Sequence, residues 1–172
     1  MIDRPLTGEP LPLDLVNTRW AAEGQVRDLF DEPGALGEWL AEHDLAPAAA
    51  EDALAPLRTV RAAIRRFLED GADDELNLVL EHGRLRLEVS DGVPGERAEV
   101  DRDDWLPAWE VARSFLELLR SAPRGRLRRC EGPECVLWFL DTSRNGRRRW
   151  CSMAGCGNRA KVKSHYDRAR GR

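Results

Sequence analysis

Four cysteines place the strongest constraint on how this chain can fold. Cys130, Cys135, Cys151 and Cys156 are all the cysteines of the 172-residue protein, and they form two pairs with four residues inside each pair. Four residues between ligands lies at the long end of the spacing in structural zinc sites, and two such turns supply a tetrahedral set of thiolates. We therefore expect a structural Zn²⁺ ion bound by these four sulfur atoms.

The alternative for four cysteines is a pair of disulfides in a secreted protein. The first ten residues, Met-Ile-Asp-Arg-Pro-Leu-Thr-Gly-Glu-Pro, lack the basic start and apolar run of a secretory signal. Nothing in them directs export, so we expect reduced thiols and a cytoplasmic protein. Zinc also suits a segment of about 50 residues, which has too little apolar mass to close a core alone.

Charge is divided unevenly along the chain. Residues 1–123 hold 13 basic against 27 acidic residues, a net charge of −14, whereas residues 124–172 hold 14 against 4, a net charge of +10. The stretch Ser-Ala-Pro-Arg-Gly at 121–125 is typical of a linker. We therefore predict an acidic domain at 1–123 and a basic domain at 124–172. The basic domain favours either an anionic partner or docking on the acidic domain.

Hydrophobic periodicity in the acidic domain predicts an α+β fold that is mainly helical. Apolar residues recur at three and four within 36–43, 48–69, 72–81 and 103–120, which predicts helices, the second of them kinked or divided at Pro56. The period changes to two over 84–89 and 97–101, which predicts a small β-hairpin. No apolar run approaches the length of about 18 residues that a membrane span needs.

The segment 11–20 is compatible with an edge strand or a short helix, and its period does not separate the two. It carries Asp14, Asn17 and Thr18, which we interpret first as turn and cap formers that satisfy nearby backbone groups, with ligand binding as the alternative. The domain contains no phosphate-binding Gly-Lys-Ser/Thr loop, no Gly-x-Ser-x-Gly and no His-Glu-x-x-His. We therefore predict that the protein is not an enzyme.

The basic domain reads as a small zinc finger of the treble-clef type, with a knuckle, a β-hairpin and a helix. Residues 136–140 form an apolar strand, Asn145-Gly146 suits a type I′ turn, and residues 147–150 would form the return strand. Good helix formers follow Cys156. We expect Trp138, Phe139 and Trp150 to form the core of the finger rather than to stack on bases.

Positive charge is dense around this metal core. Guanidinium groups suit phosphate because their planar fork binds two oxygen atoms. We therefore predict a DNA-binding surface made by Arg144, Arg147, Arg148, Arg149, Arg159, Lys161 and Lys163. Asn158 could read an adenine edge, but bracing the second metal turn is the simpler role. His165 is not needed as a ligand because four thiolates complete the tetrahedron.

Several short motifs resemble a known family. Cys156-Gly-Asn-Arg159, preceded by Trp150-Cys-Ser-Met153, Phe139-Leu-Asp-Thr-Ser143 and the first Cys-x₄-Cys, resembles the CGNR zinc finger. Leu13-Asp-Leu-Val-Asn-Thr18 resembles the opening motif of the ABATE domain that precedes that finger. The resemblance implies a stress-related transcription regulator. Its finger would bind zinc through the four cysteines and would also bind DNA, while the preceding domain would sense a ligand.

Two other functions remain open from the residues alone. The finger could be an interaction module for protein or RNA. It could also be a thiol redox switch in which oxidation expels zinc and unfolds the finger.

Overall fold

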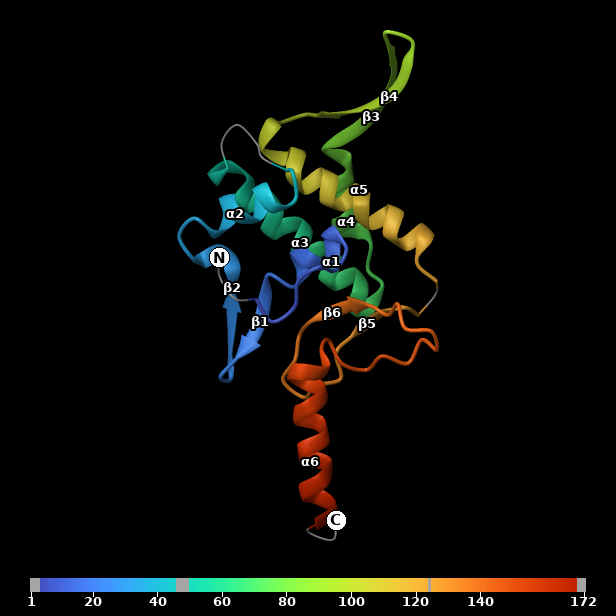
Figure 1. Cartoon of the computed structure of the whole chain (residues 1–172). Helices are drawn as coiled ribbons and strands as arrows, with labels where there is room; N and C mark the ends of the chain where they lie inside the picture. Colours follow the sequence, from blue (N-terminus) through green and yellow to red (C-terminus); the bar gives the residue numbers. More distant parts are fainter. Residues whose placement is uncertain (1–3, 46–49, 124, 170–172) are drawn as a thin grey trace. The chain divides into compact units, whose positions relative to one another are not determined.

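The computed structural model describes residues 4–45, 50–123 and 125–169 (Figure 1). The chain forms two compact units, Phe30–Ser121 and a second that joins Ile2–Leu29 with Ala122–Arg172. The predicted α+β class is confirmed, with a helical N-terminal region, small two-stranded sheets and a C-terminal β-hairpin, helix and four-cysteine cluster. The domain boundary at residue 123 stays a prediction.

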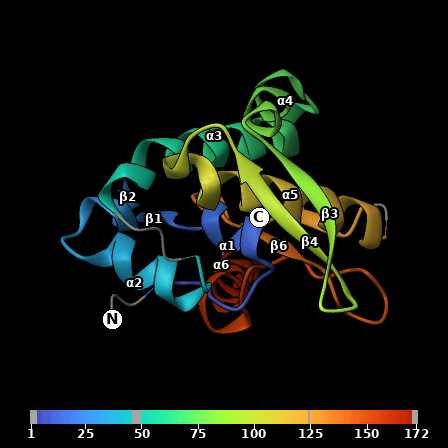
Figure 2. The same cartoon turned by 90° about the horizontal axis from the view of Figure 1, so that it is seen from above.

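The helical unit is built on three packed helices. Its elements are α2 (Ala35–Glu42), η2 (Glu51–Ala53), α3 (Leu54–Asp70), α4 (Asp74–Glu81), β3 (Gly83–Ser90), β4 (Val93–Val100), η3 (Asp103–Trp105) and α5 (Leu106–Ser121). The helices α3 and α5 lie side by side, with α4 against both (Figures 1 and 2). Their apolar faces bury Val60 and Ile64 of α3 and Val111 and Phe115 of α5 completely. Burial of such faces stabilises a fold by about 25 cal/mol per Å² of apolar surface.

Pro56 does not kink or divide a helix, in contrast to the prediction. Among the described residues, α3 begins only at Leu54, so Pro56 falls in its first turn. A backbone N–H there has no intrahelical acceptor, and proline therefore costs nothing. The three residues before α3 form the 3₁₀ turn η2 instead of continuing the helix. The first two residues of the predicted helix, 48 and 49, lie outside the described residues.

The strands β3 and β4 form the predicted hairpin, paired antiparallel from Gly83↔Val100 to Ser90↔Val93. Its turn is Asp91-Gly92, with φ of 51° and 79°. Two positive-φ residues are the pattern of a type I′ turn, which suits a two-residue connection. The second strand therefore starts at Val93, four residues before the predicted start. In Figure 1 the hairpin extends beyond the ends of the helices of its own unit.

The second unit combines the first residues of the chain with the cysteine-containing end. Its elements are α1 (Leu11–Val16), β1 (Arg19–Ala22), β2 (Gln25–Asp28), β5 (Leu127–Arg129), β6 (Trp138–Leu140), the π-helix η4 (Met153–Gly157) and α6 (Asn158–Ala169), and η1 (Leu29–Asp31) follows β2 at its edge. Of the two alternatives for the opening segment, the helix is correct, with Pro12 in its first turn. The β1–β2 hairpin was not predicted because its strands have only four residues each.

The return strand predicted at 147–150 is wrong. Strand β6 instead pairs with the upstream strand β5, in the register Leu127↔Leu140. The Asp141 carboxylate accepts hydrogen bonds from the backbone N–H groups of Ser143 (2.9 Å) and Arg148 (3.0 Å), which holds residues 141–148 as a loop. Only Gly146 has positive φ there, so the predicted type I′ turn at Asn145-Gly146 is also wrong.

Candidate metal centre

The four cysteine sulfur atoms lie together in the second unit. They all fall within 4.8 Å of one another, and no two of them form a disulfide. The Sγ–Sγ separation is 3.9 Å for Cys135–Cys151 and 3.7 Å for Cys151–Cys156. A tetrahedral zinc ion with Zn–S bonds of about 2.3 Å holds its sulfur atoms about 3.8 Å apart. The donor set therefore fits Zn²⁺ in type, number and spacing.

The first pair of cysteines sits on a tight knuckle that follows β5. The Cys130 N–H donates to the Leu137 carbonyl, and the Cys135 N–H donates to the Gly132 carbonyl, both at 2.9 Å. Gly132 is required by the close approach of the second turn, because a Cβ there would lie 3.0 Å from Cys156 Sγ. The Gly-Pro dipeptide between the ligands thus folds the chain tightly enough to bring both sulfur atoms inward.

The second pair sits at the entry to α6. Ser152 Oγ accepts a hydrogen bond from the Gly155 N–H (3.0 Å) and its carbonyl accepts one from the Gly157 N–H (3.0 Å). These bonds cap the π-helix η4 and place Cys156 just before α6, near the predicted helix start. A Cβ at Gly157 would lie 2.7 Å from Met153 Sδ, which belongs to an exposed, flexible side chain that can move aside.

Hydrogen-bond donors surround the sulfur atoms. The Cys151 N–H lies 3.3 Å from Cys130 Sγ, and the Arg159 guanidinium donates to Cys156 Sγ at 3.0 Å. The hydrogen bond to Cys156 raises the pKa of Arg159. A zinc site with four thiolates carries a net charge of −2, so a guanidinium and backbone N–H groups stabilise it. Asn158, in contrast, is exposed and reaches only the Ala154 carbonyl at 3.5 Å.

The four thiols influence one another electrostatically. A hydrogen bond from Cys135 lowers the pKa of Cys130, and the same interaction raises the pKa of Cys135 to about 12. The pKa of Cys151 is raised too, first by its hydrogen bond with Cys130. One thiolate in this cluster therefore disfavours the next. Four thiolates coexist only when a cation offsets their repulsion, which is the chemistry that a divalent metal supplies.

A cavity of about 620 Å³ opens beside the sulfur atoms within the second unit. Trp20 and its neighbours in β1 line one side, and Pro133, Arg159 and three of the cysteines line the other. Cys135 is the only one of the four cysteines that is not fully buried. The cavity therefore leaves the Cys135 sulfur the most accessible of the four.

The opening segment of the chain is attached to the finger by buried hydrogen bonds. Asn17 Nδ2 donates to the Trp138 carbonyl (2.8 Å), and the Trp138 N–H donates to Asn17 Oδ1 (2.9 Å). Glu9 accepts from the Leu140 N–H (2.8 Å), and burial raises the pKa of Glu9. Sequence reasoning missed Glu9, because a single carboxylate before Pro10 has no pattern that identifies it.

Asp14, Asn17 and Thr18 are all buried. Asp14 forms an ion pair with Arg4 at 2.5 Å, and Thr18 Oγ1 donates to the Leu15 carbonyl at 2.7 Å. Thr18 thus satisfies a nearby backbone group, whereas the groups that Asn17 satisfies belong to Trp138, 121 residues away. Ligand binding by these three residues stays a prediction.

Four of the predicted phosphate-binding residues differ in whether their charge is free to meet a phosphate. Arg144, Arg147 and Lys161 are exposed and make no side-chain ion pair among the described residues. Arg148, however, lies 4.2 Å above the Phe139 ring and donates to the Trp150 carbonyl at 3.1 Å. Its role is thus at least partly to hold the finger together.

Three other predicted residues of this surface have different surroundings. Arg149 is exposed but pairs with Glu131 at 2.6 Å. Arg159 donates to a cysteine sulfur, as described above. The side chains of Lys163 and His165 lie outside the described part of the chain.

The expected core of the finger is present. Phe139 is completely buried, Trp138 is 7% exposed, and Trp150 is half-buried. This burial leaves Trp138 and Phe139 no face for stacking on bases.

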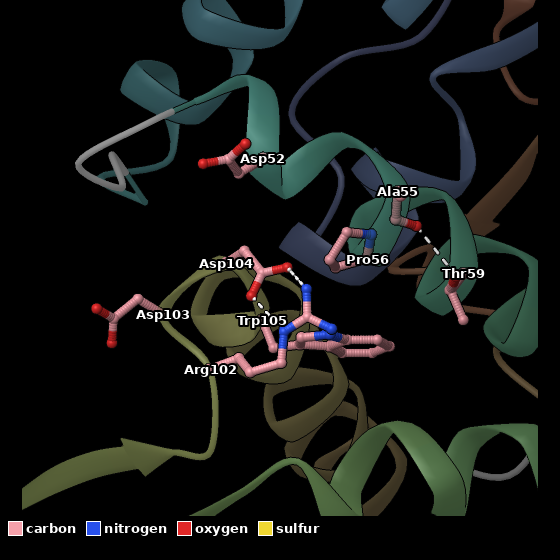
Figure 3. A pocket seen from close by; sticks show the side chains of 8 residues that line it. All are labelled: Asp52, Ala55, Pro56, Thr59, Arg102, Asp103, Asp104 and Trp105. Carbon is pink, nitrogen blue, oxygen red and sulfur yellow. Dashed lines mark hydrogen bonds and ion pairs between the residues drawn. The ribbon is translucent and has the colours of Figure 1, made fainter.

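The helical unit also has a surface hollow of about 600 Å³ (Figure 3). Pro56 and Thr59 of α3 line one side, and Arg102, Asp104 and Trp105 line the other. The guanidinium of Arg102 pairs with Asp104, and the Trp105 ring stacks on His82 with 3.5 Å between centroids. These groups satisfy one another, and the hollow holds no nucleophile paired with a base.

Comparison with known families matches nearly the whole chain. The sequence model of the ABATE family, described as a putative stress-induced transcription regulator, matches residues 9–122. The model of the CGNR zinc finger matches residues 126–169, which include all four clustered cysteines. No curated protein matches the chain. Among the described residues, no helix has both the length and the apolar character that crossing a membrane requires.

Proposed function

Because the chain belongs to the ABATE family of transcription regulators and carries a CGNR zinc finger, we propose that it regulates transcription by binding DNA through that finger. Transcription regulators are not enzymes, and the closed four-sulfur site agrees with this, since it leaves no coordination position for a substrate. Zinc has a structural role: Cys130, Cys135, Cys151 and Cys156 hold it, and it fixes the two turns that carry the basic loop and α6.

One observation carries the proposal of DNA binding. Arg144, Arg147 and Lys161 project from the metal-stabilised finger without internal ion pairs among the described residues, in a segment with a net charge of +10. Exposed cations on a rigid support bind phosphate at low conformational cost. Arg148 and Arg159 support the fold, and they hold the loop and the metal turn that present the other three.

The test is the salt dependence of duplex DNA binding by the full zinc-loaded chain. Loss of three phosphate contacts in the variant R144A/R147A/K161A should reduce the slope of log affinity against log salt by about 2.7, at about 0.9 per contact. The matched control is R66A/R102A/R120A, which removes the same charge from exposed positions of the helical unit and should leave the slope unchanged. Equal slopes for the wild type and the first variant would contradict the proposal, provided that zinc content is unchanged.

The nature of the partner follows from the same titration. Competition by single-stranded and double-stranded RNA distinguishes a DNA-binding finger from an RNA-binding module. Failure to bind either DNA or RNA would favour a protein partner instead. We also propose that the protein acts in the cytoplasm and that the ABATE region senses an unidentified ligand.

The partial exposure of Cys135 favours a second function, a thiol redox switch. An oxidant that enters the cavity meets this sulfur first, and oxidation of one ligand weakens the metal site. Peroxide should then release zinc in parallel with the loss of DNA affinity. Full retention of zinc at modest peroxide concentrations would exclude this second function and leave the first intact.

A further inference from the structure

The outer edge of strand β3 has no partner in the described part of the chain. Within those residues β3 pairs only with β4, and all seven residues from Arg84 to Ser90 are exposed. Leu87 and Val89 remain 74% and 72% exposed. A long, exposed edge strand with an apolar face readily pairs with another strand unless a device prevents it.

The other edge of the hairpin has such a device. Strand β4 contains Pro94, which lacks a backbone donor, followed by Gly95, which has no side chain to pack. Strand β3 contains neither proline nor lysine. Its only protection is the alternating charge of Arg84, Arg86 and Glu88, and that protection depends on the strand it meets.

The order of side chains in β3 matches a second copy of itself. In an antiparallel pair about a two-fold axis through Leu87, Leu87 faces Leu87 of the other copy, Arg86 faces Glu88, and Leu85 faces Val89. Directly opposed residues share a face of the sheet, so every apolar residue meets an apolar one, and Arg86 and Glu88 each meet the opposite charge. Arg84 then faces Ser90, which is neutral.

The neighbouring registers of the same antiparallel pair place unfavourable residues opposite each other. An axis through Arg86 places two arginines directly opposite each other, and an axis through Glu88 does the same with two glutamates. Like charges directly opposite are destabilising. A shift by one residue would set leucines against arginines. The charges of β3 therefore favour this register over its immediate neighbours.

The charge of the hairpin also suits a second copy. Residues 1–123 have a net charge of −14. The segment 83–100 holds three arginines against four acidic residues, a net charge of −1. The hairpin therefore adds little to the repulsion between two acidic domains.

We propose that β3 pairs with β3 of a second copy, centred on Leu87, to form a continuous four-stranded sheet and a two-fold dimer. The pairing satisfies the free backbone groups of both edges and joins the six exposed apolar residues at 85, 87 and 89 into one ridge. It is an isologous contact, which closes on itself and does not build fibres. The dimer carries two zinc fingers.

Charge reversal tests the register directly. The single variants Arg86→Glu and Glu88→Arg each place like charges opposite each other at both symmetric positions of the dimer. Sedimentation of the full zinc-loaded chain over a range of concentrations should show a dimer for the wild type, with Kd raised about tenfold or more in each single variant. The double variant R86E/E88R restores opposite charges and should regain most of the affinity.

The matched control is Arg84→Glu. Arg84 lies on the same face of the same strand and shares Glu99 with Arg86 as an ion-pair partner, but it faces Ser90 across the proposed axis. It should leave the dimer nearly unchanged. A second readout is hydrogen exchange, in which the β3 amides should become protected as protein concentration rises.

Three results would overturn the proposal. The first is a wild type that remains monomeric at the highest attainable concentration. The second is a dimer that the single charge reversals do not weaken, or that the double variant does not restore. The third is an equal loss of affinity in Arg84→Glu, because a general effect of charge on the hairpin would then replace the register. Circular dichroism and zinc content confirm that each variant is folded.

Discussion

Asn17 uses its side-chain amide as a strand would use a peptide group. It donates to the carbonyl of Trp138 and accepts from the N–H of the same residue, with both bonds buried. A buried backbone group without a partner costs about 1–3 kcal/mol. These two bonds therefore stabilise the fold mainly because they leave no backbone group of Trp138 unsatisfied. The amide is the side chain that offers a donor and an acceptor side by side.

We expect Asn17→Ala to destabilise the protein by about 2–6 kcal/mol, because both backbone groups of Trp138 lose their partner. Asn17→Asp keeps the acceptor but brings a buried charge next to a carbonyl, so it should also be destabilising. Urea denaturation measures the change. The exposed Asn145→Ala is the matched control, with an expected effect within about 0.5 kcal/mol. A near-neutral Asn17→Ala would show that water replaces the amide.

Asp141 provides a pH-dependent contribution at the same scale. The hydrogen bond from Ser143 lowers the pKa of the buried Asp141 carboxyl. A depressed folded-state pKa contributes stability above the unfolded-state pKa, near 3.8, that is lost as pH falls through the lower folded-state value. Asp141→Asn should therefore be less stable than wild type at pH 7, and the difference should shrink only below about pH 4.

Melting temperatures of wild type and Asp141→Asn across pH 3–7 measure this difference. Acid also protonates the thiolates, but that effect is common to both proteins and cancels in the comparison. A difference that stays constant down to the lowest pH would mean that the carboxylate charge contributes nothing and that only its shape matters.

At the scale of the elements, those with a local sequence pattern could be predicted from the sequence, whereas contacts between residues far apart in the chain could not. The alternation of leucine with arginine at 84–87 identified the β3–β4 hairpin, and the spacing of cysteines identified the metal-binding turns. Residues 141–148 form a loop instead of a return strand because the Asp141 carboxylate accepts two backbone hydrogen bonds. Nothing in the sequence distinguishes this carboxylate from one that faces solvent. Nothing near Asn17 in sequence indicates that it reaches Trp138, 121 residues away. Local patterns set element types, whereas register and long-range anchors depend on packing.

The start of β3 depends on a close approach at Gly83. A Cβ there would lie 2.6 Å from Trp109 Nε1, and the indole N–H donates to the Leu80 carbonyl, which holds the ring in place. Gly83→Ala should therefore cost about 1–3 kcal/mol through overpacking. Gly95→Ala lies in the same hairpin with nothing within 4 Å of its Cβ and should change stability by less than about 0.5 kcal/mol. Equal losses of stability for Gly83→Ala and Gly95→Ala in urea denaturation would show that the Trp109 indole moves aside.

At the scale of the whole molecule, bound zinc stabilises a larger part of the chain than the residues that ligate it. Structural zinc contributes about 10–16 kcal/mol in small fingers near neutral pH, and the finger has no comparable core. Residues 2–29 belong to the same compact unit, through bonds such as those of Glu9 and Asn17 to β6. The helical unit has its own buried core around α3 and α5.

Removal of zinc should consequently unfold a discontinuous part of the chain. With a strong chelator, hydrogen exchange should rise in residues 126–169 and also in the β1–β2 region, because β6 no longer holds its partners. The amides of α3 and α5 should stay protected, and Cys135→Ser, which weakens the site at one ligand, should give the same pattern at lower chelator concentrations. Protection of residues 10–29 that survives metal removal would show that this segment gains its stability elsewhere. A loss of protection throughout α3 and α5 would instead show that the protein unfolds as a single cooperative unit.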